Sequence, residues 1–212
     1  MSGSENMDGA LRRLRFCGNP LDMADGSRVA ALLAPFASER LKAFPSAWLR
    51  LKPLAERLWQ TPPVAFPSSP LTDYLLLPPE PTRRLADWLG ALAYSPILRV
   101  TLKGSILQAL RQAMPHCYPD VLRQAKAFQK WQEPLSASVT DKAALTPQQL
   151  RSHGYGLLLA MFAAFPPALL RRWRLQFPPE EIDAVTPATW TADAPATIDL
   201  LDALHHRGLI GA

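Results

Sequence analysis

A chain of 212 residues in which 48% are apolar and only 19% are charged has enough hydrophobic material for one globular domain, or for two small ones that share a core, and this excludes wholesale disorder. Its 22 prolines are about twice the usual share and predict interrupted helices. The net charge of +5 is uneven: residues 81–174 hold thirteen basic and four acidic side chains, whereas residues 175–212 hold one basic and six acidic. This asymmetry predicts charge-complementary surfaces, within the chain or toward partners.

Targeting and membrane signals are weak in this sequence. The first 15 residues are polar and then basic, with no apolar run of the kind that a secretory signal needs. The most apolar stretch, Gly154–Leu170, is at the lower limit of the length that spans a bilayer and is interrupted by Pro166 and Pro167. We therefore expect a buried core helix there and no direct membrane insertion. Cys17 and Cys117 fit no disulfide framework or zinc spacing and are expected to be reduced in the cytosol.

In chain order, residues 1–10 are expected to be disordered, and residues 11–26 mix a short apolar-basic run with turn residues, so they are expected to be irregular. Helical patterns begin at Ser27 and again at Ser46, each serine being a candidate N-cap. Residues 61–81 carry seven prolines and predict a long extended connector, where two subdomains would divide.

Helical patterns dominate the rest of the chain. The clearest start signal is Thr146, because Pro147 and Gln149 follow it as a first-turn proline and a capping-box partner, and this helix should reach about Phe165. No alternating strand pattern appears. The predicted fold class is mainly α: an irregular orthogonal helical domain over residues 11–212, with proline-broken helices and little or no β-structure. The other helical segments expected here cover residues 82–94, 95–114 with a break at Gly104, 119–132, 167–174 and 197–208.

The sequence contains no motif of a phosphate-binding loop, a dinucleotide-binding turn or a nucleophile elbow. Its four histidines lack metal-binding spacing and are interpreted as structural or surface residues. Asp87 lies within an apolar helical segment, one turn from Arg83 and Arg84, and a local ion pair explains it more simply than acid–base catalysis. No enzyme activity, cofactor or metal is predicted. A small helical enzyme would need a pocket of convergent polar groups, which no pattern indicates.

Basic residues form the first candidate site. Arg123, Lys126 and Lys130 are spaced i, i+3 and i+7 and would share one face of the helix predicted at 119–132. Three interpretations stay open: a solvated helix face, a docking surface for an acidic protein, or a nucleic-acid-binding surface that uses residues 81–174.

The second candidate site is the stretch LLRRWRLQFPPEE, Leu169–Glu181. Its arginines are expected at a helix C-terminus, where the helix dipole favours positive charge, so a phosphate grip is disfavoured. We interpret Trp173 as a packing residue, and Arg171 and Arg174 as surface arginines that are available to a partner or to the acidic residues after them.

Four short strings carry a resemblance to a known family: Leu14-Arg15-Phe16-Cys17, Pro45-Ser46-Ala47-Trp48, Ser95-Pro96-Ile97-Leu98 and the basic helix end at Arg171–Arg174. With the length and the proline-broken layout, they make nearly the whole chain resemble the sorting-platform protein K of bacterial type III secretion systems, the SctK or YscK-like family. Many members of that family have a His-Pro pair before Ser-Arg in the first helix. Here Asp25-Gly26 precedes Ser27-Arg28, so no role of that histidine is carried over.

The resemblance implies a non-enzymatic adaptor in protein transport and virulence. It implies a cytoplasmic location at the cytosolic face of the inner membrane, beneath the injectisome. The expected partners are the cytoplasmic domain of the inner-membrane ring protein SctD and the pod protein SctQ, with no nucleic acid. The alternative is a helical nucleic-acid-binding regulatory protein. The residues expected to bind partners are Arg123, Lys126, Lys130, Arg171 and Arg174.

Overall fold

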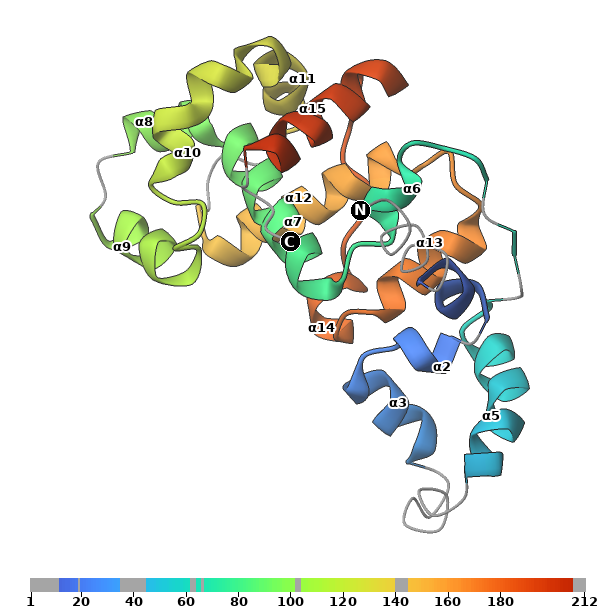
Figure 1. Ribbon diagram of the computed structural model, residues 1–212. Helices are drawn as coiled ribbons and strands as arrows, with labels where there is room; N and C mark the ends of the chain where they lie inside the picture. The colour runs from blue at the N-terminus through green and yellow to red at the C-terminus, as the bar shows by residue number, and fades with distance from the viewer. Residues whose placement is uncertain are drawn as a thin grey trace, which may run out of the picture. The chain divides into compact units, whose positions relative to one another are not determined.

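The computed structural model describes residues 12–18, 20–34, 45–61, 64–65, 67–101, 104–139 and 145–207. Every regular element in these ranges is a helix, which confirms the mainly α prediction (Figure 1). The predicted disorder of residues 1–10 lies outside the described residues. The chain divides into two compact units, which are treated separately below. Unit 1 comprises residues 1–76 and 164–184, and unit 2 comprises residues 77–163 and 185–212.

Unit 1 is built from helices of both its segments, residues 1–76 and 164–184. Helix α2 packs on α5 and on α13. The region 11–26, which was expected to be irregular, is instead largely helical, so that expectation was wrong. The helices of this unit are residues 12–18, α2 (Pro20–Met23), α3 (Gly26–Leu33), α5 (Pro45–Leu58), α6 (Thr72–Leu75), α13 (Pro167–Leu175) and α14 (Pro179–Ile182).

Helix α3 shows how side-chain chemistry joins the two segments of unit 1. Its N-cap is Asp25, whose side chain accepts from the Ser27 amide at 2.9 Å, so the prediction that Ser27 caps this helix was wrong. One turn later, Arg28 donates from Nε to the Phe177 carbonyl at 2.7 Å and pairs with Asp183. Its side chain is only 10% exposed. These contacts hold the start of α3 against the end of α13.

Unit 2 is organised around one helix pair, α7 (Pro79–Ala93) and α12 (Pro147–Met161), shown in green and pale orange in Figure 1. The start of α7 at Pro79 and the helix α6 both fall inside residues 61–81, which are therefore not the uniformly extended connector that was predicted. The remaining elements of the unit are α8 (Ser95–Val100), α9 (Gly104–Ala113), α10 (Asp120–Gln124), the 3-10 helix η1 (Ala125–Trp131), α11 (Gln132–Ala137) and α15 (Ala194–His206).

Two glycines allow α7 and α12 to approach closely. A Cβ atom at Gly154 would lie 1.8 Å from the Ala86 carbonyl oxygen, and one at Gly90 would lie 2.0 Å from the Leu150 carbonyl oxygen. No other residue fits where one helix backbone touches another this closely. Most apolar residues of both helices are buried around these contacts, and Leu158 has no exposed surface.

The start of α12 agrees with the sequence pattern, whereas its end does not. The Thr146 side chain accepts from the Gln149 amide, which confirms the predicted N-cap. The helix ends at Met161, four residues before Phe165. Within the parts of the chain that the structure describes, no helix combines the length and the apolar character needed to cross a bilayer.

Candidate functional site

Arg123, Lys126 and Lys130, here named the basic triplet, do not lie on one regular helix. The segment predicted as a single helix at 119–132 divides into α10 and η1, and Phe128 inside η1 has non-helical backbone angles, so the prediction of one continuous helix was wrong. Arg123 lies in the last turn of α10, whereas Lys126 and Lys130 belong to η1. A 3-10 helix has three residues per turn, so the α-helical spacing that was expected to align the three side chains does not apply.

All three cations of the triplet are nevertheless exposed. Arg123 pairs with Asp120 on its own helix at 2.7 Å. Lys130 reaches α15 and pairs with Asp199 at 2.5 Å, with its ammonium group 4.1 Å from the centre of the Trp131 ring. Two members of the triplet therefore already have a carboxylate partner within unit 2.

The triplet is positioned by the packing of η1 on α15. Trp131 Nε1 donates to the Ala196 carbonyl at 3.1 Å near the start of α15. Near the other end of α15, the Arg207 guanidinium lies 5.5 Å from the centre of the Phe128 ring. The later residue of η1, Trp131, meets the start of α15, whereas the earlier residue, Phe128, meets its end. The two helices are therefore antiparallel. Phe128 and Trp131 of η1 are buried, as are Leu200, Leu201 and Leu204 of α15, whereas the lysines of η1 are exposed.

The three arginines of α13 have three different environments in unit 1. Arg171 is exposed and donates to the Gln60 carbonyl at 3.2 Å. Arg174 is partly buried, and burial lowers the pKa of its guanidinium while the nearby Asp183 carboxylate raises it. Arg172 is fully buried. Arg172 therefore differs from Arg171 and Arg174, which are exposed and partly buried respectively.

Arg172 acts as an internal clamp. Its Nη1 donates to the Phe16 carbonyl at 2.9 Å and its Nη2 donates to the Thr61 carbonyl at 2.7 Å. One guanidinium thus donates to backbone carbonyl groups of two chain segments that are far apart in sequence. Trp173 beside it is completely buried and packs edge-on against Phe177, with ring centres 5.3 Å apart, which confirms its predicted packing role.

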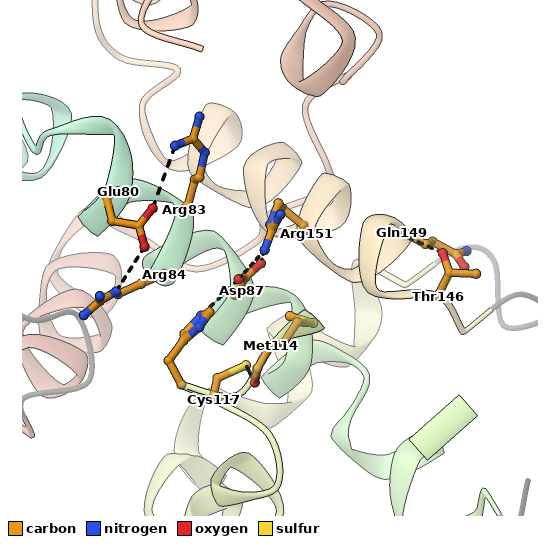
Figure 2. A network of polar contacts seen from close by, with 10 residues as sticks. Glu80, Arg83, Arg84, Asp87, Met114, Cys117, Thr146, Gln149 and Arg151 are labelled. Carbon is orange, nitrogen blue, oxygen red and sulfur yellow. Dashed lines mark hydrogen bonds and ion pairs between the residues drawn. The ribbon is translucent and has the colours of Figure 1, made fainter. Parts of the chain in front are cut away.

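The ion-pair partner of Asp87 differs from the one that was predicted. Arg83 and Arg84 are directed at Glu80, at 3.8 and 3.4 Å, so the predicted local pairing of Asp87 with them was wrong (Figure 2). Asp87 is fully buried and instead faces Arg151 of α12, as Figure 2 shows. Spacing along one helix could not reveal this partner, because the pair is 64 residues apart in sequence.

Two further side chains adjoin Asp87. His116 Nε2 lies 3.0 Å from Asp87 Oδ2, although it is not aligned for a hydrogen bond. The Cys117 thiol is buried and contacts the Met114 carbonyl oxygen at 3.7 Å. Burial, and after it the negative charge of Asp87, raises the pKa of Cys117 well above its usual range. The thiol is therefore protonated at neutral pH, and this cluster presents no thiolate nucleophile.

A serine–histidine contact in unit 2 has the wrong polarity for nucleophilic catalysis. Ser138 Oγ donates to the Leu135 carbonyl at 2.6 Å and lies 2.8 Å from His153 Nε2. Because the single hydroxyl proton is committed to the carbonyl, the histidine must donate to the serine, whereas an activated serine donates to the histidine. The His153 ring also packs edge-on against Tyr94, which is consistent with a structural role.

Among the described residues, no group of histidine, cysteine and carboxylate side chains is arranged to hold a metal ion. The geometry instead provides exposed cations on a helical framework whose buried charges, Asp87 and Arg172, are bound inside their own unit. Comparison of the chain with protein-family models, curated proteins and solved structures found no match.

Proposed function

We propose that the protein is a non-enzymatic adaptor of the type III secretion sorting platform, which links the inner-membrane ring protein SctD to the pod protein SctQ. The observation that carries this proposal is the exposure of Arg123, Lys126 and Lys130 on the η1 side of unit 2, where they can meet acidic side chains of a partner. Arg171, and the exposed part of Arg174, are the corresponding proposed contacts in unit 1.

The ion pairs that already involve the triplet do not prevent docking. The Arg123–Asp120 and Lys130–Asp199 pairs join side chains that are about half exposed or more. Such surface pairs contribute only about 0–1 kcal/mol, so carboxylates of a partner can replace Asp120 and Asp199 at little cost. Lys126 is also exposed and adds a third positive charge.

The strings behind the family resemblance support the proposal by their positions. Leu14–Cys17 lies on the helix at 12–18, Pro45 begins α5, and Ser95 begins α8. The basic string Arg171–Arg174 lies in the last turns of α13, and of its side chains Arg171 is exposed and Arg174 is partly exposed. Three of the four strings thus lie at the start or the end of a helix, where side chains are often presented for recognition.

The test is a pull-down with the purified cytoplasmic domain of SctD and with SctQ from the same genome. The wild-type chain should retain both, and reversal of Arg123, Lys126 and Lys130 to glutamate should weaken capture of SctD at least tenfold. A matched control reverses Arg84, Arg99 and Arg111, which belong to the same unit and change the net charge equally.

Capture of neither protein by the folded wild-type chain would contradict the proposal. Equal losses in the two triple variants would assign the effect to net charge rather than to this surface. Tight binding to random duplex DNA, with an affinity that falls steeply as salt rises, would instead favour a nucleic-acid-binding protein.

A further inference from the structure

Two large apolar side chains are left in solvent on unit 1. Leu14, on the helix at 12–18, is 69% exposed, and Leu58, at the end of α5, is 58% exposed. Leu51 and Ala55, which lie earlier in α5, are buried, in contrast to Leu58. Single exposed leucines are ordinary, so what matters here is the position of each leucine relative to its neighbours.

The Arg172 clamp links the two backbone segments that carry these leucines. Its guanidinium bonds to the Phe16 and Thr61 carbonyl oxygens at once. Leu14 precedes Phe16 by two residues, and Leu58 precedes Thr61 by three. Each leucine therefore lies within about one helical turn of a residue held by the same guanidinium. Figure 1 shows the helix at 12–18, in dark blue, beside the C-terminal end of α5.

Exposed arginines lie next to both leucines in the sequence or are bonded to the same turn. Arg15 follows Leu14, and Arg57 precedes Leu58, and both side chains are exposed. Arg171 is also exposed and is tied to the same turn through its bond to the Gln60 carbonyl at 3.2 Å. The nearby carboxylate Glu56 is largely buried and pairs with Lys52, so it does not neutralise these arginines.

We propose that Leu14, Arg15, Arg57, Leu58 and Arg171, here named the clamp surface, bind an acidic amphipathic helix of a partner protein. The two leucines would pack against its aliphatic side chains, and the three guanidinium groups would pair with glutamate or aspartate carboxylates along its flanks. Aliphatic contacts ringed by arginine are typical of protein interfaces, and a guanidinium matches a carboxylate with two parallel hydrogen bonds.

The geometry favours a protein partner over a lipid surface. Helices that lie in a membrane interface carry a long apolar face, commonly with Trp or Phe. The clamp surface instead combines one residue pair from each of two separate segments, Leu14–Arg15 and Arg57–Leu58, held by a buried guanidinium. The inference does not rest on the secretion role and stands or fails separately from it.

The experiment measures binding of a labelled helical peptide with leucine along one face and glutamate along both flanks, by fluorescence anisotropy. The wild-type chain should bind it, and a peptide with glutamine in place of every glutamate should bind at least tenfold more weakly. Two double variants, L14S with L58S and R15E with R57E, should each weaken binding at least tenfold. A matched control, V100S, removes an exposed aliphatic side chain of unit 2 and should bind as the wild type does.

Hydrogen exchange should slow on peptide binding in residues 12–18 and 57–61. Circular dichroism verifies that each variant is folded, so a loss of binding reports the surface itself. Absence of peptide binding, equal binding of the glutamine peptide, or equal binding by L14S with L58S would overturn the proposal. It would also be overturned if the same leucines were required for binding to phosphatidylglycerol vesicles, or for self-association in a concentration series, while peptide binding did not depend on them.

Discussion

Asp87 and Arg151 are joined by two parallel hydrogen bonds that link α7 to α12, from Arg151 Nε to Asp87 Oδ1 at 2.7 Å and from Nη2 to Oδ2 at 2.8 Å. The Asp87 side chain has no exposed surface, whereas Arg151 is about one third exposed. A carboxylate buried in this way is tolerated only while its charge is matched, so the pair sets the register of the central helix pair of unit 2.

Replacing Arg151 with methionine should therefore lower the free energy of unfolding by about 3–5 kcal/mol, because it leaves a buried carboxylate without its main partner. The double replacement of Asp87 by leucine and Arg151 by methionine should cost less than the single change, since no charge is then buried. Urea denaturation followed by circular dichroism measures both. A loss below about 1 kcal/mol in the single variant would mean that His116, 3.0 Å from Asp87, compensates the charge by itself.

The contact between the two helix backbones gives a second prediction. Alanine at Gly154 should destabilise the fold by at least about 1–3 kcal/mol, because its Cβ would overlap the Ala86 carbonyl oxygen and force α7 and α12 apart. In an open helix the same change would be stabilising, since alanine has the higher helix propensity. Gly104, which has no neighbouring atom within 4 Å of its Cβ position, is the matched control. A neutral Gly154 variant beside a neutral Gly104 variant would contradict the close approach.

The helix cap at Thr146 and the buried charges Asp87 and Arg172 show which features could be predicted from the sequence and which could not. The N-cap at Thr146 depends on residues within one turn, and the sequence pattern identified it correctly. The partner of Asp87 lies on another helix, so the nearest arginines along the chain were a misleading choice. The burial of Arg172 was missed for the same reason, because its two carbonyl acceptors belong to segments more than a hundred residues away. Local chemistry predicted the helical class and the cap at Thr146, and tertiary packing decided which charges are buried.

His153 gives the protein an acid-sensitive contact. Burial lowers the pKa of its ring below the ordinary value of about 6.5. The folded state thus favours the neutral ring, and its stability is complete above pH 6.5. As the pH falls below 6.5, the unfolded chain takes up the proton first, so stability declines until the folded pKa is reached.

The melting temperature of the wild type should therefore fall more steeply between pH 7 and pH 5 than that of a His153→Gln variant, which keeps a donor for Ser138 but cannot titrate. Differential scanning calorimetry across this pH range compares the two slopes, and other titrating groups cancel in the comparison. Parallel slopes would show that His153 is protonated as easily in the fold as in the unfolded chain.

The last prediction separates the adjacent arginines of α13. Methionine at Arg172 removes the donors that satisfy the buried carbonyls of Phe16 and Thr61, so it should cost at least about 2 kcal/mol of stability. Methionine at the exposed Arg171 should change stability by no more than about 0.5 kcal/mol.

Arg174 should lie between these two, because it is partly buried beside Asp183. Reversal of Arg171 to glutamate is consequently the cleaner test of docking, whereas reversal of Arg174 would disturb the packing around Arg28, which donates to the Arg174 carbonyl. Guanidinium chloride denaturation of the three variants gives their order. If Arg171 proved as costly as Arg172, the exposed arginine would be holding the fold together and could not serve as a free contact for a partner.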